Sequence, residues 1–468
     1  MWVKMKNLTV EDILKVTKGE LVIGNEKLEC ENFSRDTRSI QKGDTYIAIK
    51  GENFDGNIFW KDAFEKGADC VIVQDIEFSN EDLKEFDDKT IIKVADTMQA
   101  LYEIASYKRK INNIPVVAIT GSVGKTSTKD MVASVISQKY KTLKTIGNNN
   151  NNIGLPFTIL RLKDEEIMIL EMGMNHFGEI HLLSNIAKPN ICVITNIGTS
   201  HIGNLGSKEN ILKAKLEILD GADNPTIIIN NDDELLHKWY LENKDSRKII
   251  TYGIENKSDI MAKDMILEQE KSTYKCNIDG KEMDVEVPIA GRHFVLNSLC
   301  ATTVGITLNI DSSKIINGIK NVELTKKRMD IKEINGIKVI NDAYNASPEA
   351  MKASLNYLSS FKDNRKIAVL GDMFELGEYA EKLHRLVGEE VYKNNIDILV
   401  CAGENVKLMA DEALKNGMKK EDIYYFEDKD EILEVLKNIV KTGDIVLFKA
   451  SNGMKFYELV DRFIDMIR

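Results

Sequence analysis

The stretch Ile119–Ser127, with the sequence ITGSVGKTS, limits what this chain can fold into more than any other. It follows an apolar run that starts at Pro115 and leads into a segment with helical spacing, which predicts a strand, a phosphate-binding loop and a helix. Glycines permit the tight turn, and the helix start adds partial positive charge. Lys125 is spaced to reach the terminal phosphates, and Thr126 to offer its hydroxyl to Mg²⁺.

The loop has the short form of the pattern, G-x-x-G-K-T, because Ile119 stands where the full motif has a glycine. A plain glycine turn before a helix is the alternative interpretation, but the order of apolar strand, Gly, Gly-Lys-Thr and helix is demanding. The sequence therefore predicts a nucleoside triphosphate site, whose contacts are Gly121, Ser122, Val123, Gly124, Lys125, Thr126 and Ser127.

Size and charge narrow the class of protein. With 468 residues, 43% of them hydrophobic, the chain is long enough for two or three domains. Its net charge of −11 and the lack of a basic block argue against nucleic acid or an anionic membrane surface as the main partner. No apolar run approaches the roughly 18 residues of a membrane span, and the polar N-terminus does not fit a signal peptide. Six scattered cysteines without C-x-x-C spacing fit a reducing compartment, so we expect a cytoplasmic protein, and a monomer.

The order of apolar segments predicts an α/β fold with three domains. Residues 1–112 are expected to form an N-terminal α/β unit, and residues 113–324 a central ATP-binding domain with a mostly parallel sheet. Within it, residues 264–287 predict short strands around the Asp279–Gly280 turn, as a hairpin insertion. In residues 325–468, strands recur about every 25 residues, which predicts a Rossmann-like domain without a G-x-G-x-x-G fingerprint.

Polar residues follow two strands of the central domain. Glu171 comes directly after the apolar run 167–170, so its carboxylate is expected at the sheet edge, near a phosphate-bound Mg²⁺. His201 lies in the loop after the next strand, where it is suited to bind metal, to transfer a proton or to be an ordinary loop histidine. Lys213 and Lys215 fall in the amphipathic segment 211–218, whose periodicity alone predicts that both are exposed to solvent.

Several motifs in a fixed order resemble those of the Mur ligases, over nearly the whole chain. They are TGSVGKTS (120–127), GNNNNNIGLP (147–156), ILEMGMNHFGEI (169–180), TNIGTSHIGNLGS (195–207), KAKLEI (213–218), GRHFVLN (291–297), NDAYNASP (341–348) and GDMFELG (371–377). The first domain adds SRDTRSIQKGDTYIAIKGENFDG (34–56). Within the family, EMGMNH, DAYNASP and GDMFELG favour the members that add D-alanyl-D-alanine.

The resemblance implies an N-terminal domain for the UDP end of a precursor, a central ATPase domain and a mobile C-terminal domain that brings an amine. It implies that ATP phosphorylates the terminal carboxylate of UDP-N-acetylmuramoyl-tripeptide, and that D-alanyl-D-alanine attacks the resulting acyl phosphate. The expected products are the UDP-MurNAc-pentapeptide precursor of peptidoglycan, ADP and phosphate.

The same resemblance implies roles for single residues. Two Mg²⁺ ions are expected, held by Thr126, Glu171, His201 and Lys215, and Lys215 is expected to be carbamylated. The implied catalytic residues are Lys125, Glu171, His201, Lys215 and Arg328, with Arg328 aimed at the γ-phosphate. Further implied nucleotide contacts are Asn297, Asp342, Tyr344 and Asn345. Candidate contacts to the UDP precursor are Ser34, Thr37, Arg38, Asn53, Asp55, Asn148, Asn151 and Asn152.

Two positions depart from the family pattern. Phe294 stands where the family often has asparagine, which leaves Asn297 as the adenine-side amide, and Asn452 stands where arginine is more common. Two other functions stay open at this point. One is a related ligase that adds a single amino acid to a muramoyl peptide or glutamate to a folate. The other is a P-loop ATPase or kinase whose third domain only binds a partner.

Overall fold

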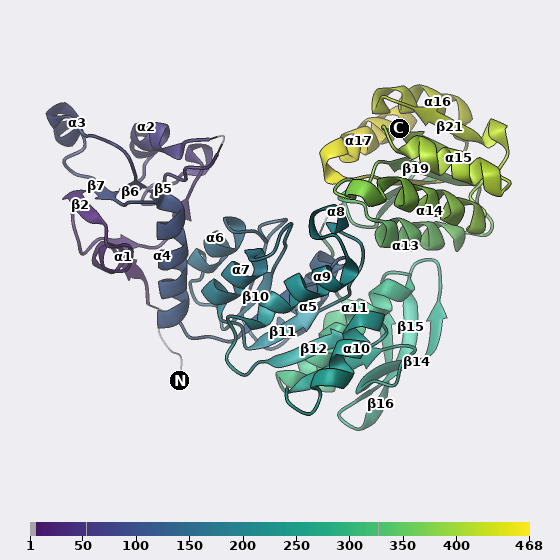
Figure 1. Cartoon of the computed structure of the whole chain (residues 1–468), viewed down its shortest axis with the longest axis horizontal. Helices are drawn as coiled ribbons and strands as arrows, with labels where there is room; N and C mark the ends of the chain where they lie inside the picture. The colour runs from purple at the N-terminus through teal and green to yellow at the C-terminus, as the bar shows by residue number, and fades with distance from the viewer. Residues whose placement is uncertain (1–5, 53, 326) are drawn as a thin grey trace.

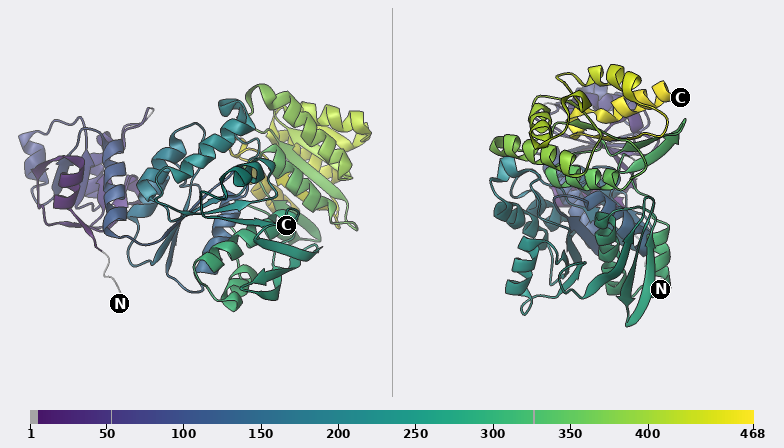
Figure 2. Two further views of the ribbon diagram at one scale, coloured as in Figure 1. Left: turned by 60° about the horizontal axis from the view of Figure 1, so that its bottom comes forward. Right: turned by 90° about the vertical axis from the view of Figure 1, so that its right-hand side faces the viewer.

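Three main sheets organise the computed structural model, which describes residues 6–52, 54–325 and 327–468. They follow one another along the long axis of the molecule, with the first and third at opposite ends (Figure 1, Figure 2). Each sheet lies within one of the three residue ranges predicted above, although the boundaries themselves stay a prediction. The predicted α/β class with a largely parallel central sheet is confirmed.

The N-terminal sheet has the strand order β2-β7-β6-β5-β4, in which only β2 runs antiparallel to its neighbour. Its strands are β2 (Glu20–Ile23), β4 (Phe33–Ser34), β5 (Thr45–Ile47), β6 (Cys70–Val73) and β7 (Thr90–Lys93), while β1 (Leu8–Thr9) and β3 (Glu29–Cys30) form a separate pair. The helices are α1 (Val10–Thr17), α2 (Trp60–Glu65), α3 (Asn80–Glu85) and α4 (Thr97–Ile111). Arg109 of α4 donates from Nε to the Ala187 carbonyl at 2.8 Å, which fastens this unit to the central one.

The central sheet has nine strands in the order β16-β15-β14-β13-β12-β11-β8-β10-β9. They are β8 (Val116–Thr120), β9 (Thr142–Lys144), β10 (Ile167–Glu171), β11 (Ile191–Ile194), β12 (Thr226–Asn230), β13 (Ile249–Gly253), β14 (Ile260–Leu267), β15 (Ser272–Ile278) and β16 (Lys281–Val287). The strands from β9 to β14 are parallel, and β14, β15 and β16 form an antiparallel meander. The helices are α5 (Lys125–Ile136), α6 (Gly154–Leu160), α7 (Glu179–Ala187), α8 (Ile202–Leu205), α9 (Lys208–Leu216), α10 (Glu234–Asn243), α11 (Arg292–Thr307) and α12 (Ser312–Lys320).

Strand β8 is wholly buried because helices cover both faces of the sheet. Val116 and Ala118 pack with side chains of α6, α7 and α9, whereas Val117 and Ile119 pack with side chains of α5, α11 and α12. The continuous apolar run therefore places the phosphate loop at the carboxyl edge of the parallel strands, where α/β proteins bind ligands.

The C-terminal sheet has the order β17-β18-β22-β19-β20-β21 and is parallel except for β17. Its strands are β17 (Asp330–Ile334), β18 (Ile337–Asn341), β19 (Lys366–Gly371), β20 (Ile398–Ala402), β21 (Ile423–Phe426) and β22 (Ile445–Lys449). The helices are α13 (Pro348–Ser359), α14 (Ala380–Lys393), α15 (Val406–Asn416), α16 (Ile432–Ile439) and α17 (Phe456–Ile467). This is the Rossmann-like arrangement that the strand spacing predicts.

The predicted hairpin in residues 264–287 is confirmed. The turn at Asp279–Gly280 joins β15 and β16, and both residues have positive φ, 52° and 80°. Because β14 pairs in parallel with β13, these strands extend the central sheet. Among the residues that the structure describes, no helix combines the length and apolarity that a membrane crossing needs.

Candidate active site

The phosphate loop joins β8 to α5, and residues that follow β11 fix its conformation. Gly121 and Gly124 have φ of 155° and 81°, and a Cβ on Gly121 would lie 1.9 Å from Thr195 Oγ1, so only glycine fits there. Asn196 braces the loop, because its Oδ1 accepts from the Val123 N–H at 2.9 Å and its carbonyl from the Ser122 N–H at 3.1 Å.

Lys125 occupies the mouth of this loop. Its Nζ donates to the Gly121 carbonyl at 2.8 Å and to the Ser122 carbonyl at 3.4 Å. Burial lowers the pKa of this amine, and nearby Arg328 lowers it further, whereas Glu171 opposes the shift. The ammonium group is now bonded to two neutral carbonyls. A bound phosphate would offer it a negatively charged acceptor instead.

Arg328 reaches the same loop from the segment that precedes β17. One guanidinium nitrogen donates to Thr126 Oγ1 at 3.0 Å, and the guanidinium carbon lies 4.0 Å from the centre of the Tyr344 ring. Its Nε is buried without a hydrogen-bond partner in the described residues. Three of the predicted nucleotide contacts are therefore together, with a donor left free for a ligand.

Glu171 ends β10 beside the loop and is 2% exposed. Asn150 Nδ2 donates to Oε1 at 2.7 Å, while Oε2 makes no hydrogen bond within the described chain and lies 3.9 Å from the Lys129 ammonium. A buried carboxylate oxygen without a partner indicates a missing cation or donor. The sequence-based prediction did not include Asn150, although the adjacent Asn148, Asn151 and Asn152 were chosen.

A buried cluster of charged side chains around Asp130 lies next to the phosphate loop. Asp130 of α5 accepts from Lys144 Nζ at 2.8 Å and lies 3.5 Å from Lys129 Nζ. It also accepts from the Thr325 backbone N–H at 2.9 Å and from the Thr325 hydroxyl at 2.7 Å. Burial alone would raise the pKa of Asp130, but Lys129 and Lys144 hold it below its ordinary value. Asp130 therefore fixes the segment that carries Arg328 to the helix of the phosphate loop.

Asp130→Asn is expected to lower the free energy of unfolding by about 2 kcal/mol, because hydrogen bonds to a buried charge are lost. Urea denaturation measures this, and Asp164→Asn, which breaks an exposed pair with Lys141, is the control, for which little or no loss of stability is expected. Since the folded pKa of Asp130 is depressed, its contribution holds above the unfolded value of 3.8 and disappears as the pH falls through the folded value. Equal stability losses in both variants would contradict the assignment.

His201 lies at the start of α8 with a left-handed backbone, φ 64°. Its Nδ1 is 2.5 Å from Oε2 of Glu375, which follows β19, and this contact lowers the pKa of Glu375. Nearby, Tyr379 Oη donates to the Gly206 carbonyl at 2.7 Å, and Thr199 donates from its N–H at 2.8 Å and its hydroxyl at 3.1 Å to the Glu349 carboxylate. The C-terminal unit thus contacts the loop after β11 through hydrogen bonds and the His201–Glu375 pair.

Lys215 of α9 is 1% exposed, so the solvent exposure predicted from helical periodicity is wrong for this residue. It is correct for Lys213, which is exposed. Burial drives the pKa of Lys215 well below 10.5, and the charge of Lys125 lowers it further. Lys215 therefore holds a buried amine with a strongly lowered pKa close to Lys125 of the phosphate loop.

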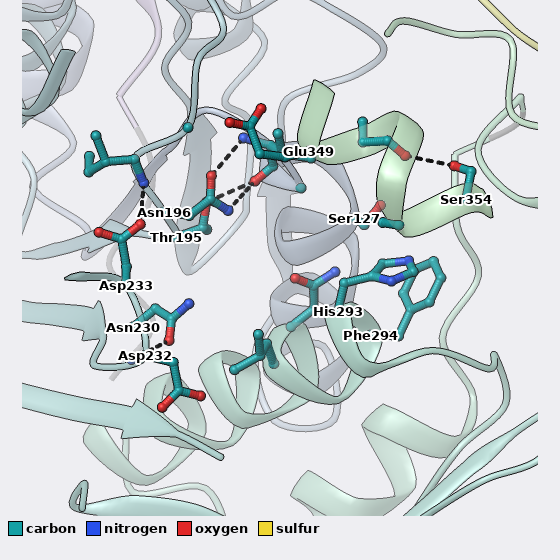
Figure 3. Close-up of a pocket in the computed structure, with 18 of the residues that line it drawn as sticks. Ser127, Thr195, Asn196, Asn230, Asp232, Asp233, His293, Phe294, Glu349 and Ser354 are labelled. Carbon is teal, nitrogen blue, oxygen red and sulfur yellow. Dashed lines mark hydrogen bonds between the residues drawn. The ribbon is translucent and has the colours of Figure 1, made fainter. Parts of the chain in front are cut away.

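A cavity of about 460 Å³ opens on the other side of the loop, between the central and C-terminal units (Figure 3). Figure 3 shows Asn230, Asp232 and Asp233 on one wall and His293 and Phe294 on the other. Predicted nucleotide contacts that line it are Val123, Gly124, Ser127, Asn297, Arg328 and Asp342. The size and polar edges suit a nucleoside.

The predicted adenine-side amide Asn297 and the departure from the family pattern at Phe294 both line this cavity. Asn297 Oδ1 accepts from the Thr128 hydroxyl at 3.0 Å, so this amide is tied to α5. Phe294 is 2% exposed and packs in the apolar core under the sheet, with its ring centre 4.2 Å from that of His293. Burial lowers the pKa of His293 to about 4, so its ring is neutral at pH 7.

Asp342 follows β18 at the edge of the same cavity. Its Oδ2 accepts from Lys449 Nζ at 2.5 Å and from the Ser354 hydroxyl at 2.6 Å. Lys449 also donates to the Asn345 carbonyl at 3.1 Å, and Asn345 Oδ1 accepts from the Asn452 N–H at 3.3 Å. The C-terminal predictions Asp342 and Asn345 thus belong to one bonded cluster.

A second, polar cleft of about 370 Å³ lies on the opposite side of Lys125 and Arg328. Sequence predictions that line it are Ser122, Lys125, Asn148, Asn151, Glu171, His201, Arg328, Tyr344 and Asn345. Asn152 is not among its lining residues, and neither are the first-domain candidates that the structure describes. Of these, Arg38 pairs with Asp36, Ser34 hydrogen bonds to Ser39, and Asp55 accepts from Asn57; Asn53 lies outside the described residues. Thr37 also makes a local contact, since a hydrogen bond from its side chain lowers the pKa of Asp62.

Known protein families and curated proteins match this chain over nearly its whole length. Family models match as "Mur ligase family, catalytic domain" at residues 31–109, "Mur ligase middle domain" at 119–305 and "Mur ligase, glutamate ligase domain" at 327–452. The chain is 37% identical over 461 residues to the UDP-N-acetylmuramoyl-tripeptide–D-alanyl-D-alanine ligase of Bacillus subtilis strain 168, covering 98% of each.

Solved structures agree as well. A crystal structure of MurF from Acinetobacter baumannii has a TM-score of 0.88 at 28% identity, covering 99% of this chain and 100% of that one. MurF ligase from Thermotoga maritima in complex with ADP has a TM-score of 0.80 at 29% identity, covering 93% and 98%.

Proposed function

This chain belongs to the Mur ligase family, and on that premise we propose that it joins D-alanyl-D-alanine to UDP-N-acetylmuramoyl-tripeptide at the expense of ATP. One observation carries the proposal. The nucleotide cavity and the polar cleft meet at Arg328, so a γ-phosphate placed there faces both the nucleotide and an acceptor. The cleft is closed on its far side by Asn345, Ser451 and Asn452 of the C-terminal unit.

The chemistry needs this arrangement because a carboxylate is a poor electrophile. Transfer of the γ-phosphoryl group to the terminal carboxylate of the tripeptide gives an acyl phosphate and ADP. The ammonium group of the dipeptide first loses a proton, and the resulting amine attacks the carbonyl carbon to give a tetrahedral intermediate. Phosphate leaves and the nitrogen releases a second proton as the amide bond forms. Lys125 and Arg328 offset the negative charge of the transferring group, and the loop N–H groups bind the neighbouring phosphates.

The residues present fit Mg²⁺ beside the loop. The buried Glu171 Oε2 has no hydrogen-bond partner in the described chain, and Thr126 offers a hydroxyl. The described residues contain no cluster of three His, Cys, Asp or Glu side chains arranged for a metal, but a phosphate-bound Mg²⁺ needs only one or two protein ligands. When bound, Mg²⁺ neutralises charge on the transferring phosphoryl group and orients its oxygens.

Lys215 and His201 are proposed to hold a second Mg²⁺ after Lys215 becomes carbamylated. A neutral amine adds to CO₂ and releases a proton, which yields an anionic carbamate. Burial lowers the pKa of the Lys215 amine well below 10.5, which supports this step because a lower pKa increases the share of the neutral form that reacts with CO₂.

The substrate-binding residues, the oligomeric state and the cellular compartment are also proposed. The first-domain residues Ser34, Thr37, Arg38, Asn53 and Asp55 are proposed to bind the UDP end, and Asn148, Asn151 and Asn152 the muramoyl peptide. We propose a monomer in the cytoplasm; the six free cysteines, all buried, fit a reducing compartment.

Phosphate release from ATP and Mg²⁺ tests the function. With UDP-N-acetylmuramoyl-tripeptide present, release is expected to require D-alanyl-D-alanine and to give a product heavier by the dipeptide less water. Release with a single amino acid would favour another ligase of the family. Full release without any amine would favour a plain ATPase.

A further inference from the structure

The polar cleft has an uneven distribution of charge. Its lining on the side of the phosphate loop includes Lys125, Glu171, Glu179, His201 and Arg328. Among the lining residues that follow β17, Glu375 is the only charged one; the others are Tyr344, Asn345, Ala346, Ser347, Phe374, Leu376, Ser451, Asn452 and Gly453. The C-terminal wall of the cleft therefore offers a single carboxylate among neutral groups.

The backbone holds Glu375 in an unfavourable conformation. Its φ is 63°, in the left-handed region that residues with side chains seldom adopt. The Glu375 carbonyl accepts from the Gly203 N–H at 3.1 Å, and a Cβ on Gly377 would lie 2.9 Å from Gly203 Cα. Close docking on the central loop thus keeps the strained turn in place, and strain of this kind is concentrated at functional sites.

The Glu375 side chain has room for a ligand. It is 48% exposed, and among the described residues only His201 Nδ1 contacts its carboxylate, at 2.5 Å from Oε2. A carboxylate can accept several hydrogen bonds at once, so Oε1 can accept from an ammonium group while Oε2 stays on His201. Phe374, which is 47% exposed, and the buried Leu376 flank it with apolar surface. The surroundings suit a small ligand with one ammonium group and short apolar side chains.

Resting on the proposed function, we propose that Glu375 binds the ammonium group of the incoming dipeptide and that Phe374 and Leu376 contact its methyl groups. The α-amine of a peptide has a pKa near 7.7–8.0, so it reaches the cleft mainly as a cation. Two other carboxylates line the cleft and already have partners. Glu171 lies beside the phosphate loop and accepts from Asn150, and Glu179 accepts from the Asn175 N–H at 2.9 Å. Glu375 is the carboxylate that faces the acceptor from the C-terminal side.

Glu375→Gln tests this binding role, because it keeps the shape of the side chain and removes its charge. We expect KM for D-alanyl-D-alanine to rise about 10- to 100-fold, the value of a charge-assisted hydrogen bond. Hydroxylamine, a small neutral nucleophile, traps the acyl phosphate as a hydroxamate without the dipeptide. Its trapping rate is expected to stay within about twofold of wild type. The control is Glu378→Gln, an exposed residue three positions on, with no change expected in either measurement.

The outcomes separate the inference from the function on which it rests. Wild-type release that depends on the dipeptide, together with a raised KM and normal trapping in Glu375→Gln, supports the assignment. An unchanged KM overturns it. A parallel loss of hydroxamate formation also overturns it, because Glu375 would then act through His201 on phosphoryl transfer. If wild-type release ignores the dipeptide, the proposed function fails first.

Discussion

Replacing Lys125 by alanine is expected to lower dipeptide-dependent phosphate release by about 100- to 1,000-fold, the cost of removing one preorganised donor from a developing charge. The ammonium lines both the polar cleft and the loop, and its present acceptors are two backbone carbonyls. A terminal phosphate would compete for it with full negative charge. The loss should therefore appear in kcat as well as in kcat/KM, measured with saturating ATP and precursor.

Two variants make this result specific. Lys125→Met keeps most of the side-chain length but removes the charge, so it should lose as much activity as the alanine variant. Lys139→Ala, just beyond the end of α5, removes an exposed lysine that donates to the Asn309 carbonyl and should leave the rate unchanged. Near-normal turnover in Lys125→Met would show that packing, and not charge, explains the role of this residue.

The phosphate loop could be predicted from sequence because its requirements are local. A buried strand, two glycines with positive φ and a helix beginning at Lys125 are set by residues that adjoin one another. Most parallel strands of the central and C-terminal sheets could be predicted for the same reason, since continuous apolar runs mark strands covered on both faces. Strands β9 and β17 were not predicted, because they are short or partly exposed and lack such a run.

Contacts between distant segments could not be predicted from any local pattern. Asn150 looked like its neighbours in a run of five asparagines, yet it is the one that holds Glu171. Glu375 and Glu349 are separated from the loop after β11 by more than a hundred residues, and only the packing of the C-terminal unit brings them to His201 and Thr199. The family motifs mark these segments as important, but they do not predict which side chains are in contact.

Lys215 shows where periodicity misleads. Residues of an amphipathic helix that fall on the polar stripe are expected in solvent, and Lys213 obeys this rule. Lys215 lies two positions on and is buried, with its amine near enough to Lys125 of the phosphate loop for the two charges to interact. Within the described part of the chain this amine has no carboxylate partner, and because burying such a group is energetically costly, its presence indicates a chemical use.

Lys215→Ala is accordingly expected to lower turnover on the order of 100-fold, by removing an anionic ligand proposed for the metal site. Formate or acetate added at high concentration should restore part of the activity, because a free carboxylate can occupy the space of the lost carbamate. Lys213→Ala, on the same helix and exposed, should keep wild-type turnover and show no response to these acids.

A second measurement does not depend on turnover. Wild-type protein equilibrated with ¹³C-bicarbonate should give a carbamate carbon signal by NMR that Lys213→Ala retains and Lys215→Ala lacks. Burial lowers the pKa of the Lys215 amine and so favours the neutral form that reacts with CO₂, whereas an ordinary exposed lysine stays protonated at neutral pH and reacts poorly. Normal activity in Lys215→Ala, or a carbamate signal that survives the substitution, would mean that the buried amine serves packing alone.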